Sequence, residues 1–200
     1  MSEVYTLLLR LEGPMQSWGY RSRFDYRDTA LEPTRSGVIG LICAAMGIAR
    51  GEDISRFDDI RMGVRVDKPG RPERDYHTAL DVIKADGKGT DTVVSHRDYI
   101  ADASFTVGLQ SGNKDLLEEI SNHLKSPVWP LFLGRKAFPL TVPPLLDSSE
   151  PLKAGTLEDH LLRGDAGSRV VLETPDGERT QHDWPVCFGN RRFRPRSLRT

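Results

Sequence analysis

The spacing of apolar residues along the chain predicts three strands. Residues 4–11 form a short, mostly apolar run, which is typical of a strand in the interior of a sheet. Residues 60–66 alternate between apolar and polar side chains, and the same alternation returns over residues 99–109. Each of these two strands is therefore expected to bury one face.

The longest apolar stretch lies between the first two strands. Residues 37–49 carry no polar side chain, yet they are too few to cross a bilayer, which needs about 20 apolar residues. We expect a buried helix that follows Pro33 and is capped by Thr34 or Ser36. Its glycines fit a close approach to a sheet. Arg35 lies beside the helix N-terminus, where an anion such as a phosphate is favoured. A core helix with an exposed arginine at its start fits the same residues.

A second helix is expected after the third strand. Asn113 is a suitable N-cap and Pro127 ends the helix. Four apolar side chains form one stripe between them: Leu116, Leu117, Ile120 and Leu124. One more strand, which we place at residues 128–133, completes the split βαβ pattern of the ferredoxin-like fold, an α+β architecture.

Residues 67–98 interrupt this regular pattern. They are rich in charged residues, proline and glycine, and they show no steady period. Within them, residues 78–84 and 90–95 fit the two arms of a hairpin that turns at residues 85–89. An arm of this length inside a compact domain usually has a function or is disordered. We therefore predict a projecting hairpin.

The pattern is weaker in the last quarter of the chain. Residues 157–163 fit a short helix capped by Thr156. Residues 169–174 and 181–188 fit two strands, and the turn-forming residues between them predict a second hairpin.

Charge and cysteine content narrow the class of protein. The 200 residues carry a net charge of −1, so no global basic field indicates a nucleic-acid partner. Residues 185–200, however, hold five arginines and no acid, and residues 126–146 also lack acids, so local basic patches are expected. Cys43 and Cys187 lie in apolar runs and are expected in the core. The N-terminal residues lack a secretory pattern, so we expect a cytoplasmic protein without a membrane partner.

Signs of catalysis are few. The sequence lacks a Gly-rich phosphate-binding loop and a dinucleotide fingerprint, and no two of its five histidines have helical ligand spacing. We expect no metal site and no cofactor. Metal-independent RNA cleavage needs a base and an acid, for which the candidates are Tyr26, His77, His96 and Lys136. Aromatic residues and arginines interleave over residues 20–32, which suits RNA binding or a loop that seals the core.

Four blocks carry a family resemblance. They occur in the order 9–19 (LRLEGPMQSWG), 33–41 (PTRSGVIGL), 102–107 (DASFTV) and 130–136 (PLFLGRK). Together with residues 74–78 (RDYHT), they resemble the CasD family of subunits that cap the 5′ handle of CRISPR RNA in type I-E Cascade complexes, within the RAMP superfamily.

The resemblance implies a domain organisation and a function. Residues 1–140 are expected to form a ferredoxin-like, RRM-related domain with residues 67–98 as a thumb, and residues 141–200 a small β-rich region. The function implied is non-catalytic: the subunit binds the 5′ handle of CRISPR RNA and helps to assemble the antiviral complex. Its partners would be the repeated backbone subunit and the large subunit, with target DNA met indirectly through the complex.

The resemblance also implies site residues. The expected RNA-binding residues are Met15, Gln16, Ser17, Trp18, Arg23, Arg35, Ser36, Arg135 and Lys136. Of these, Arg35, Arg135 and Lys136 would hold phosphates. The expected thumb residues are Tyr76, His77 and Arg97, and no catalytic residue is expected. Two alternatives remain: a metal-independent endoribonuclease that processes CRISPR repeat RNA, and an assembly module without direct RNA contact.

Overall fold

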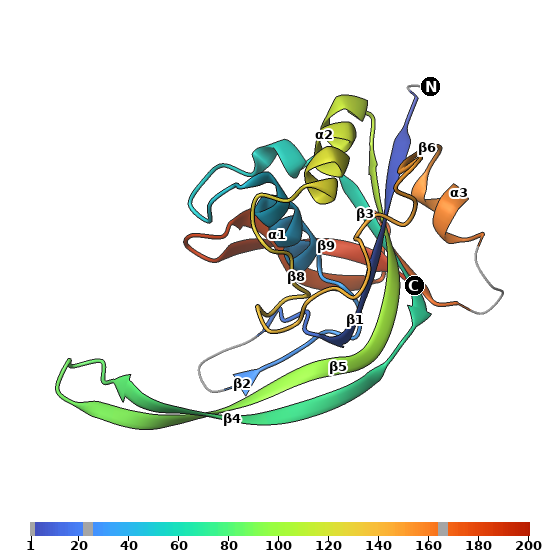
Figure 1. Ribbon diagram of the computed structural model, residues 1–200. Coiled ribbons are helices and arrows are strands. Elements are labelled where there is room, and N and C mark those ends of the chain that lie inside the picture. The colour runs from blue at the N-terminus through green and yellow to red at the C-terminus, as the bar shows by residue number, and fades with distance from the viewer. Residues whose placement is uncertain (1–2, 22–25, 164–167) are drawn as a thin grey trace.

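The protein is organised around one large, mostly antiparallel sheet, which the computed structural model describes for residues 3–21, 26–163 and 168–200 (Figure 1). Along the sheet the described strands follow the order β6-β1-β5-β3-β7-β9-β8, and β2 and β4 also pair with β5. The strands are β1 (Tyr5–Gln16), β2 (Tyr26–Arg27), β3 (Arg61–Lys68), β4 (Arg71–Ile83), β5 (Thr90–Ser111), β6 (Leu152–Ala154), β7 (Val170–Glu173), β8 (Arg179–Cys187) and β9 (Arg192–Arg199). The helices are α1 (Arg35–Met46), the 3₁₀-helix η1 (Ser55–Phe57), α2 (Lys114–Lys125) and α3 (Leu157–Leu161).

The main core lies between one face of the sheet and the helices α1 and α2 (Figure 1). Neighbouring strands place buried side chains in register, as with Leu9 on β1, Val107 on β5 and Val64 on β3. Thr34 caps α1 and Asn113 caps α2. The strands predicted at residues 4–11, 60–66 and 99–109 and the two long helices are therefore confirmed. No helix within the described residues is long and apolar enough to span a membrane.

The short helix α3 packs on the opposite face of the sheet. Leu157 and Leu161 form a small second cluster with Leu172. A Cβ atom at Gly63 would lie 2.7 Å from Leu161, and one at Gly108 would lie 2.6 Å from Leu157, so the helix approaches the sheet only because both positions lack a side chain. The helix expected in this region is confirmed, together with its threonine cap.

β4 and β5 form a long hairpin whose outer part projects from the body of the protein (Figure 1). The chain turns over residues 84–89, where Gly87 and Gly89 have φ values of 71° and 80°. The predicted hairpin is therefore confirmed. Its strands pair over a longer stretch than expected, because residue 71 already pairs with residue 101 and the pairing continues until residue 83 pairs with residue 90. Most side chains of β4 are exposed, so this arm adds little to the core.

The predicted strand at residues 128–133 is absent. Only Phe132 makes an isolated bridge there, with Pro139. The N–H groups of Val128 and Trp129 donate instead to carbonyls at the end of α1, at 2.9 and 3.2 Å. Because these backbone groups cap a helix, they are not available to a sheet, and β6 takes the place beside β1.

Two other boundaries also differ from the predictions. β7 and β8 do not form a hairpin, because β9 lies between them and pairs with both. β1 continues to Gln16 instead of ending at Leu11, because the long strand β5 supplies partners as far as Ile100. Periodicity predicted that these segments are strands, but it did not predict which strands would pair.

Candidate nucleic-acid interface

A cleft of about 380 Å³ opens beside the N-terminus of α1, and three of the four resemblance blocks meet there. The loop after β1 contributes residues 17–20, and the chain before β6 contributes Gly134 and Arg135. The start of α1 contributes Thr34, Ser36 and Gly37. The remaining lining residues come from other parts of the chain: Arg27, Asp28, Arg50, His182, Phe188 and Phe193.

The end of β1 and the loop after it, which lines the cleft with residues 17–20, have mostly buried side chains. Nε2 of the buried Gln16 donates to the carbonyl of Ala103 at 2.8 Å, and its Oε1 accepts from Nε1 of Trp18 at 3.1 Å. Trp18 and Ser17 are also buried, while Met15 is partly buried against the core. The expectation that the Gln16 amide is free to contact RNA is wrong, because its hydrogen bonds are made inside the protein.

Two glycines allow the blocks to come this close. A Cβ atom at Gly37 would lie 2.7 Å from the ring of Trp18, which packs against the first turn of α1. Gly134 has a φ of 87°, and a Cβ atom there would lie 1.7 Å from the carbonyl oxygen of Ser17. Both contacts require glycine. They place Arg135 directly beside the loop after β1.

Arg135 provides a cation at the edge of the cleft. Its Nη2 donates to the carbonyl of Asp98 at 2.7 Å, and no ion pair to it is present among the described residues. Burial lowers the pKa of Arg135, and the nearby charge of Arg97 acts in the same direction. Lys136 is exposed, and Ser36 is half-buried with its hydroxyl 3.4 Å from that of the helix cap. Among the expected RNA-binding residues that the structure describes, Ser36, Arg135 and Lys136 therefore have accessible polar groups.

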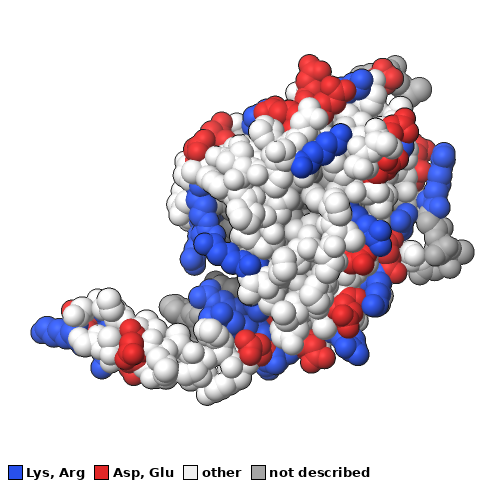
Figure 2. Space-filling view, in the orientation of Figure 1, with Lys and Arg blue, Asp and Glu red and all other residues white. Residues whose placement is uncertain are grey.

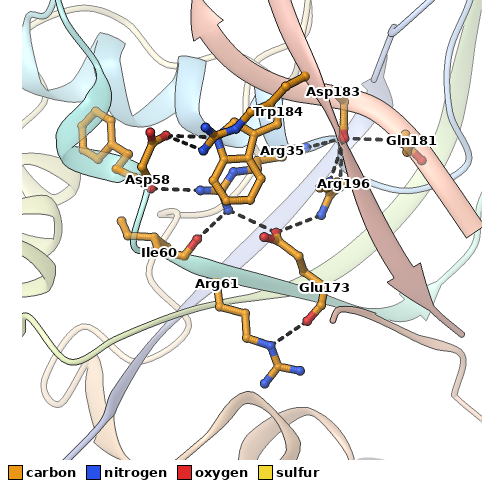
Figure 3. A network of polar contacts seen from close by, with 11 residues as sticks. Arg35, Asp58, Ile60, Arg61, Glu173, Gln181, Asp183, Trp184 and Arg196 are labelled. Carbon is orange, nitrogen blue, oxygen red and sulfur yellow. Dashed lines mark hydrogen bonds and ion pairs between the residues drawn. The ribbon is translucent and has the colours of Figure 1, made fainter. Parts of the chain in front are cut away.

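Arg35 is directed into the protein, away from solvent (Figure 3). Its side chain is 1 % exposed, and Nη1 donates to the carbonyl of Ile60 at 2.6 Å and to Glu173 at 3.2 Å. Nη2 donates to the carbonyl of Phe57 at 2.9 Å, and the guanidinium carbon lies 3.6 Å from the ring centre of Trp184. Burial lowers the pKa of Arg35 to about 10, so the group is still charged at neutral pH. The expectation of an exposed Arg35 that binds a phosphate is wrong.

The anion at the N-terminus of α1 is a carboxylate of the protein itself. Oδ2 of Asp183 accepts from the backbone N–H of Arg35 at 2.7 Å and from Gln181 at 3.0 Å (Figure 3). Arg196 donates to both oxygens of Asp183, at 2.7 and 2.8 Å, and lies 3.4 Å from Glu173. This buried network connects the start of α1 to β7, β8 and β9. It occupies the position that the sequence analysis assigned to a phosphate.

The side of the cleft that is formed by the end of the chain was not predicted from the sequence. Four residues that line the cleft were not among the predicted site residues. They come from the β8–β9 region and from the loop after α1: His182, Phe188, Phe193 and Arg50. The arginine-rich stretch at residues 185–200 was a signal, but its position relative to α1 was not predictable. Arg27 lies in the segment of interleaved aromatic residues and arginines, and Arg23 falls outside the described residues. In Figure 2, Lys and Arg atoms gather on both sides of a recess between the body and the base of the arm.

The expected thumb residues lie where β2 joins the hairpin. Tyr76 is opposite His96 in the register and is 63 % exposed, with the two ring centres 5.5 Å apart. His77 is opposite Ser95 in the same register. Nε of Arg97 donates to the hydroxyl of Ser95 at 3.0 Å. All three residues therefore lie along one short segment of the arm.

The four candidates for RNA cleavage are not joined to one another by hydrogen bonds within the described residues. The hydroxyl of Tyr26 donates to Asp98, whose carboxylate also accepts from Nε of Arg74 at 2.7 Å. The bond to Asp98 raises the pKa of Tyr26, so the phenolate is disfavoured at neutral pH. Within the described part of the chain, no hydrogen bond joins any two of Tyr26, His77, His96 and Lys136. The same part holds no group of three or more potential metal ligands.

A cleft that combines arginines with aromatic rings is typical of proteins that bind single-stranded nucleic acid. A family model for the CRISPR-associated protein (Cas_Cas5) matches residues 6–199. The chain therefore belongs to this CRISPR-associated family.

Individual relatives agree with this family. The chain is 33% identical to the CRISPR system Cascade subunit CasD of Escherichia coli (strain K12), and the match covers 95% of this chain and 92% of CasD. It is similar to a chain of a CRISPR RNA-guided surveillance complex, with a TM-score of 0.83 and 33% identity over 97% of this chain and 88% of the other. A crystal structure of a Cas protein has a TM-score of 0.76 and 41% identity, and the match covers 97% of this chain and 92% of that one.

Proposed function

We propose that this chain is a non-catalytic RNA-binding subunit of a type I-E Cascade complex, which binds the 5′ handle of CRISPR RNA and helps to assemble the complex. The observation that carries the proposal is the cleft beside α1, where three resemblance blocks meet and arginines lie next to aromatic rings. The names of the relatives support it, because one is a Cascade subunit and another belongs to an RNA-guided surveillance complex.

In this proposal the accessible cations hold the RNA backbone. Arg135 and Lys136 bind phosphates, and the hydroxyl of Ser36 adds a polar contact. A guanidinium has five N–H donors, and the structure uses only Nη2 of Arg135 in hydrogen bonds among the described residues, so the other donors suit a phosphate. Splayed bases occupy the aromatic part of the cleft. The buried Trp18 lines the cleft, and its ring N–H donates to Gln16 beneath it.

The strand order supports a ferredoxin-like domain. In the sheet, β6, β1, β5 and β3 lie side by side in this order, and each neighbouring pair is antiparallel. By their order along the chain, these are the fourth, first, third and second of the four strands. The two intervening helices, α1 and α2, contribute to the same core, as the split βαβ pattern requires. Since β6 lies beyond residue 140, we extend the proposed domain to include it.

The arm is proposed as a thumb that contacts partners in the complex. Most side chains of β4 are exposed and few of them contribute to the core, so the outer part of the arm is available to contact partner subunits. The protein partners would be the repeated backbone subunit and the large subunit, and target DNA would be met through the complex. The assembly would act in the cytoplasm.

The test is to incubate the purified full chain with labelled CRISPR repeat RNA and to measure retention and cleavage together. We expect retention without cleavage. Arg135→Ser should weaken retention roughly tenfold, because a charged hydrogen bond is worth about 1.5–3 kcal/mol. Arg163→Ser is the matched control: its side chain is 78% exposed, near α3 on the opposite face, so retention should not change. Cleavage would favour the endoribonuclease, and neither retention nor cleavage would favour the assembly module.

A further inference from the structure

We propose that the turn between β8 and β9 forms a second wall of the RNA cleft, which stacks one base of the handle and binds the phosphates beside it. The second wall consists of Arg50, Phe188, Arg191, Arg192 and Phe193. The inference rests on the proposed function, and it assigns a role to the arginine-rich end of the chain.

The second wall is held against α1 by close packing. Phe188 packs against the main core, and a Cβ atom at Gly40 would be 3.8 Å from its ring. A Cβ atom at Gly189 would lie 3.2 Å from the carbonyl oxygen of Arg50, so the turn contacts the loop after α1. The N–H of Arg191 donates to the carbonyl of Phe188 at 3.4 Å. These contacts bring two segments that are distant in the sequence together as one surface.

Phe193 presents an aromatic ring to the cleft. It is 40% exposed and lines the cleft together with Phe188. Their ring centres are 6.4 Å apart in an edge-to-face arrangement, so Phe188 supports Phe193 from the core side. An exposed ring among arginines is the arrangement with which proteins stack single-stranded bases and hold their phosphates.

The arginines around the turn between β8 and β9 divide into two groups. Arg194 and Arg196 are neutralised by carboxylates of the protein, at 3.2 and 2.7 Å. Arg191, Arg192 and Arg50 are exposed, and none of them makes an ion pair with another described residue. The second group therefore has uncompensated charge beside the cleft, which suits a phosphate backbone.

RNA explains this combination better than an acidic protein surface does. Cations lie on both sides of the recess in Figure 2, and Arg27 and Arg135 line the cleft together with Phe193. Phosphates at both ends of one nucleotide would reach cations while its base meets the ring. An acidic protein surface would use the cations without needing the ring.

The experiment measures binding of the full chain to labelled CRISPR RNA that carries its 5′ handle, over a series of salt concentrations. Phe193→Ala should weaken binding roughly fivefold to a hundredfold without changing the salt dependence. The double variant Arg191→Ser/Arg192→Ser should reduce the slope of log K against log salt by about 1.4, since each phosphate contact on a single strand contributes about 0.7. Leu162→Ala, at another exposed apolar residue, is the control and should bind like the parent protein.

A second measurement identifies stacking directly. The same RNA is prepared with an abasic site at each handle position in turn. At one handle position, the abasic site should weaken binding to the parent protein as much as Phe193→Ala weakens binding to intact RNA. The Phe193→Ala variant should bind this abasic RNA as well as it binds intact RNA. Phe193→Leu keeps an apolar contact with Phe188 but lacks the ring, so it should show the same insensitivity while remaining folded.

The possible outcomes separate the two proposals. If Arg135→Ser weakens binding but the wall variants bind like the parent protein, the second wall is wrong and the proposed function stands. If Arg135→Ser also binds like the parent protein, the RNA site is misplaced and both proposals fail. If the wall variants bind RNA normally but do not enter the complex, the surface contacts a protein and the inference is overturned.

Discussion

Replacing Arg35 with alanine should strongly destabilise the protein. The residue is at a helix start, where an exposed arginine would contribute little to stability. In the structure, however, its guanidinium is buried and donates hydrogen bonds to Glu173 and to the carbonyls of Ile60 and Phe57. Alanine would remove all of these bonds together with the stacking on Trp184.

The expected loss follows from the burial of this network. Removing one member of a buried ion pair typically costs about 3–5 kcal/mol, because the remaining charge is left uncompensated. Glu173 keeps a contact with Arg196 at 3.4 Å, which limits the loss, while the two carbonyls lose donors that water cannot easily replace. We therefore expect a loss of about 3–5 kcal/mol. For a chain of this size, each kcal/mol lowers the melting temperature by about 2–4 °C, which gives a total decrease of about 6–20 °C.

Thermal and urea unfolding of the parent protein and of Arg35→Ala would test this value. Arg163→Ala is the control, because its side chain is 78% exposed and lies 3.9 Å from Asp159, so it should change stability by less than about 0.5 kcal/mol. Arg35→Lys should also be destabilising, since one ammonium cannot replace the planar fork of donors. If Arg35→Ala melts like the parent protein but loses RNA binding, the network is not structural and the helix start is an RNA site.

Three further predictions concern the arm, catalysis and the cysteines. Replacing residues 78–95 with a short Gly-Ser linker should leave a cooperative melt but prevent assembly of the complex, and normal assembly would refute the thumb role. His77→Ala and His96→Ala should leave CRISPR RNA maturation unchanged, and a loss of processing by either folded variant would overturn the non-enzyme proposal. Burial raises the pKa of Cys43 to about 12. Iodoacetamide at about pH 8 should therefore modify the half-buried Cys187 before Cys43, as followed by mass spectrometry.

The sequence predicted the elements of the core well because burial leaves a local pattern in each of them, either a periodic placement of apolar side chains or an unbroken apolar run. The period of two was visible in β3 and in residues 99–109 of β5, and the period of 3.6 in α2, whereas β1 and α1 were recognised as continuous apolar runs. The pairing of strands depends on competition among distant segments. β9, for example, lies between β7 and β8 although it follows both in the chain.

The site was harder to predict because its polar groups are satisfied across long sequence distances. The helix start at Arg35 has the local features of an anion site, and an anion does bind there. The anion is Asp183, which is 148 residues away in the sequence. In the same way, Gly134 gave no periodic signal, yet its missing side chain is what lets Arg135 approach Ser17.

The internal anion changes how the cleft would hold RNA. Because Asp183 accepts from the backbone N–H of Arg35, this amide is not available to a phosphate, and side chains must provide the positive charge. Stability and binding then depend on different residues. The buried network fixes the position of α1 relative to β8 and β9, whereas in the proposed function Arg135 and the exposed arginines contact RNA. Arg35→Ala should therefore lose stability first and binding only as a consequence, while Arg135→Ser should lose binding with a much smaller decrease in melting temperature, because the hydrogen bonds that it removes among the described residues are only those to the carbonyls of Asp98 and Arg27.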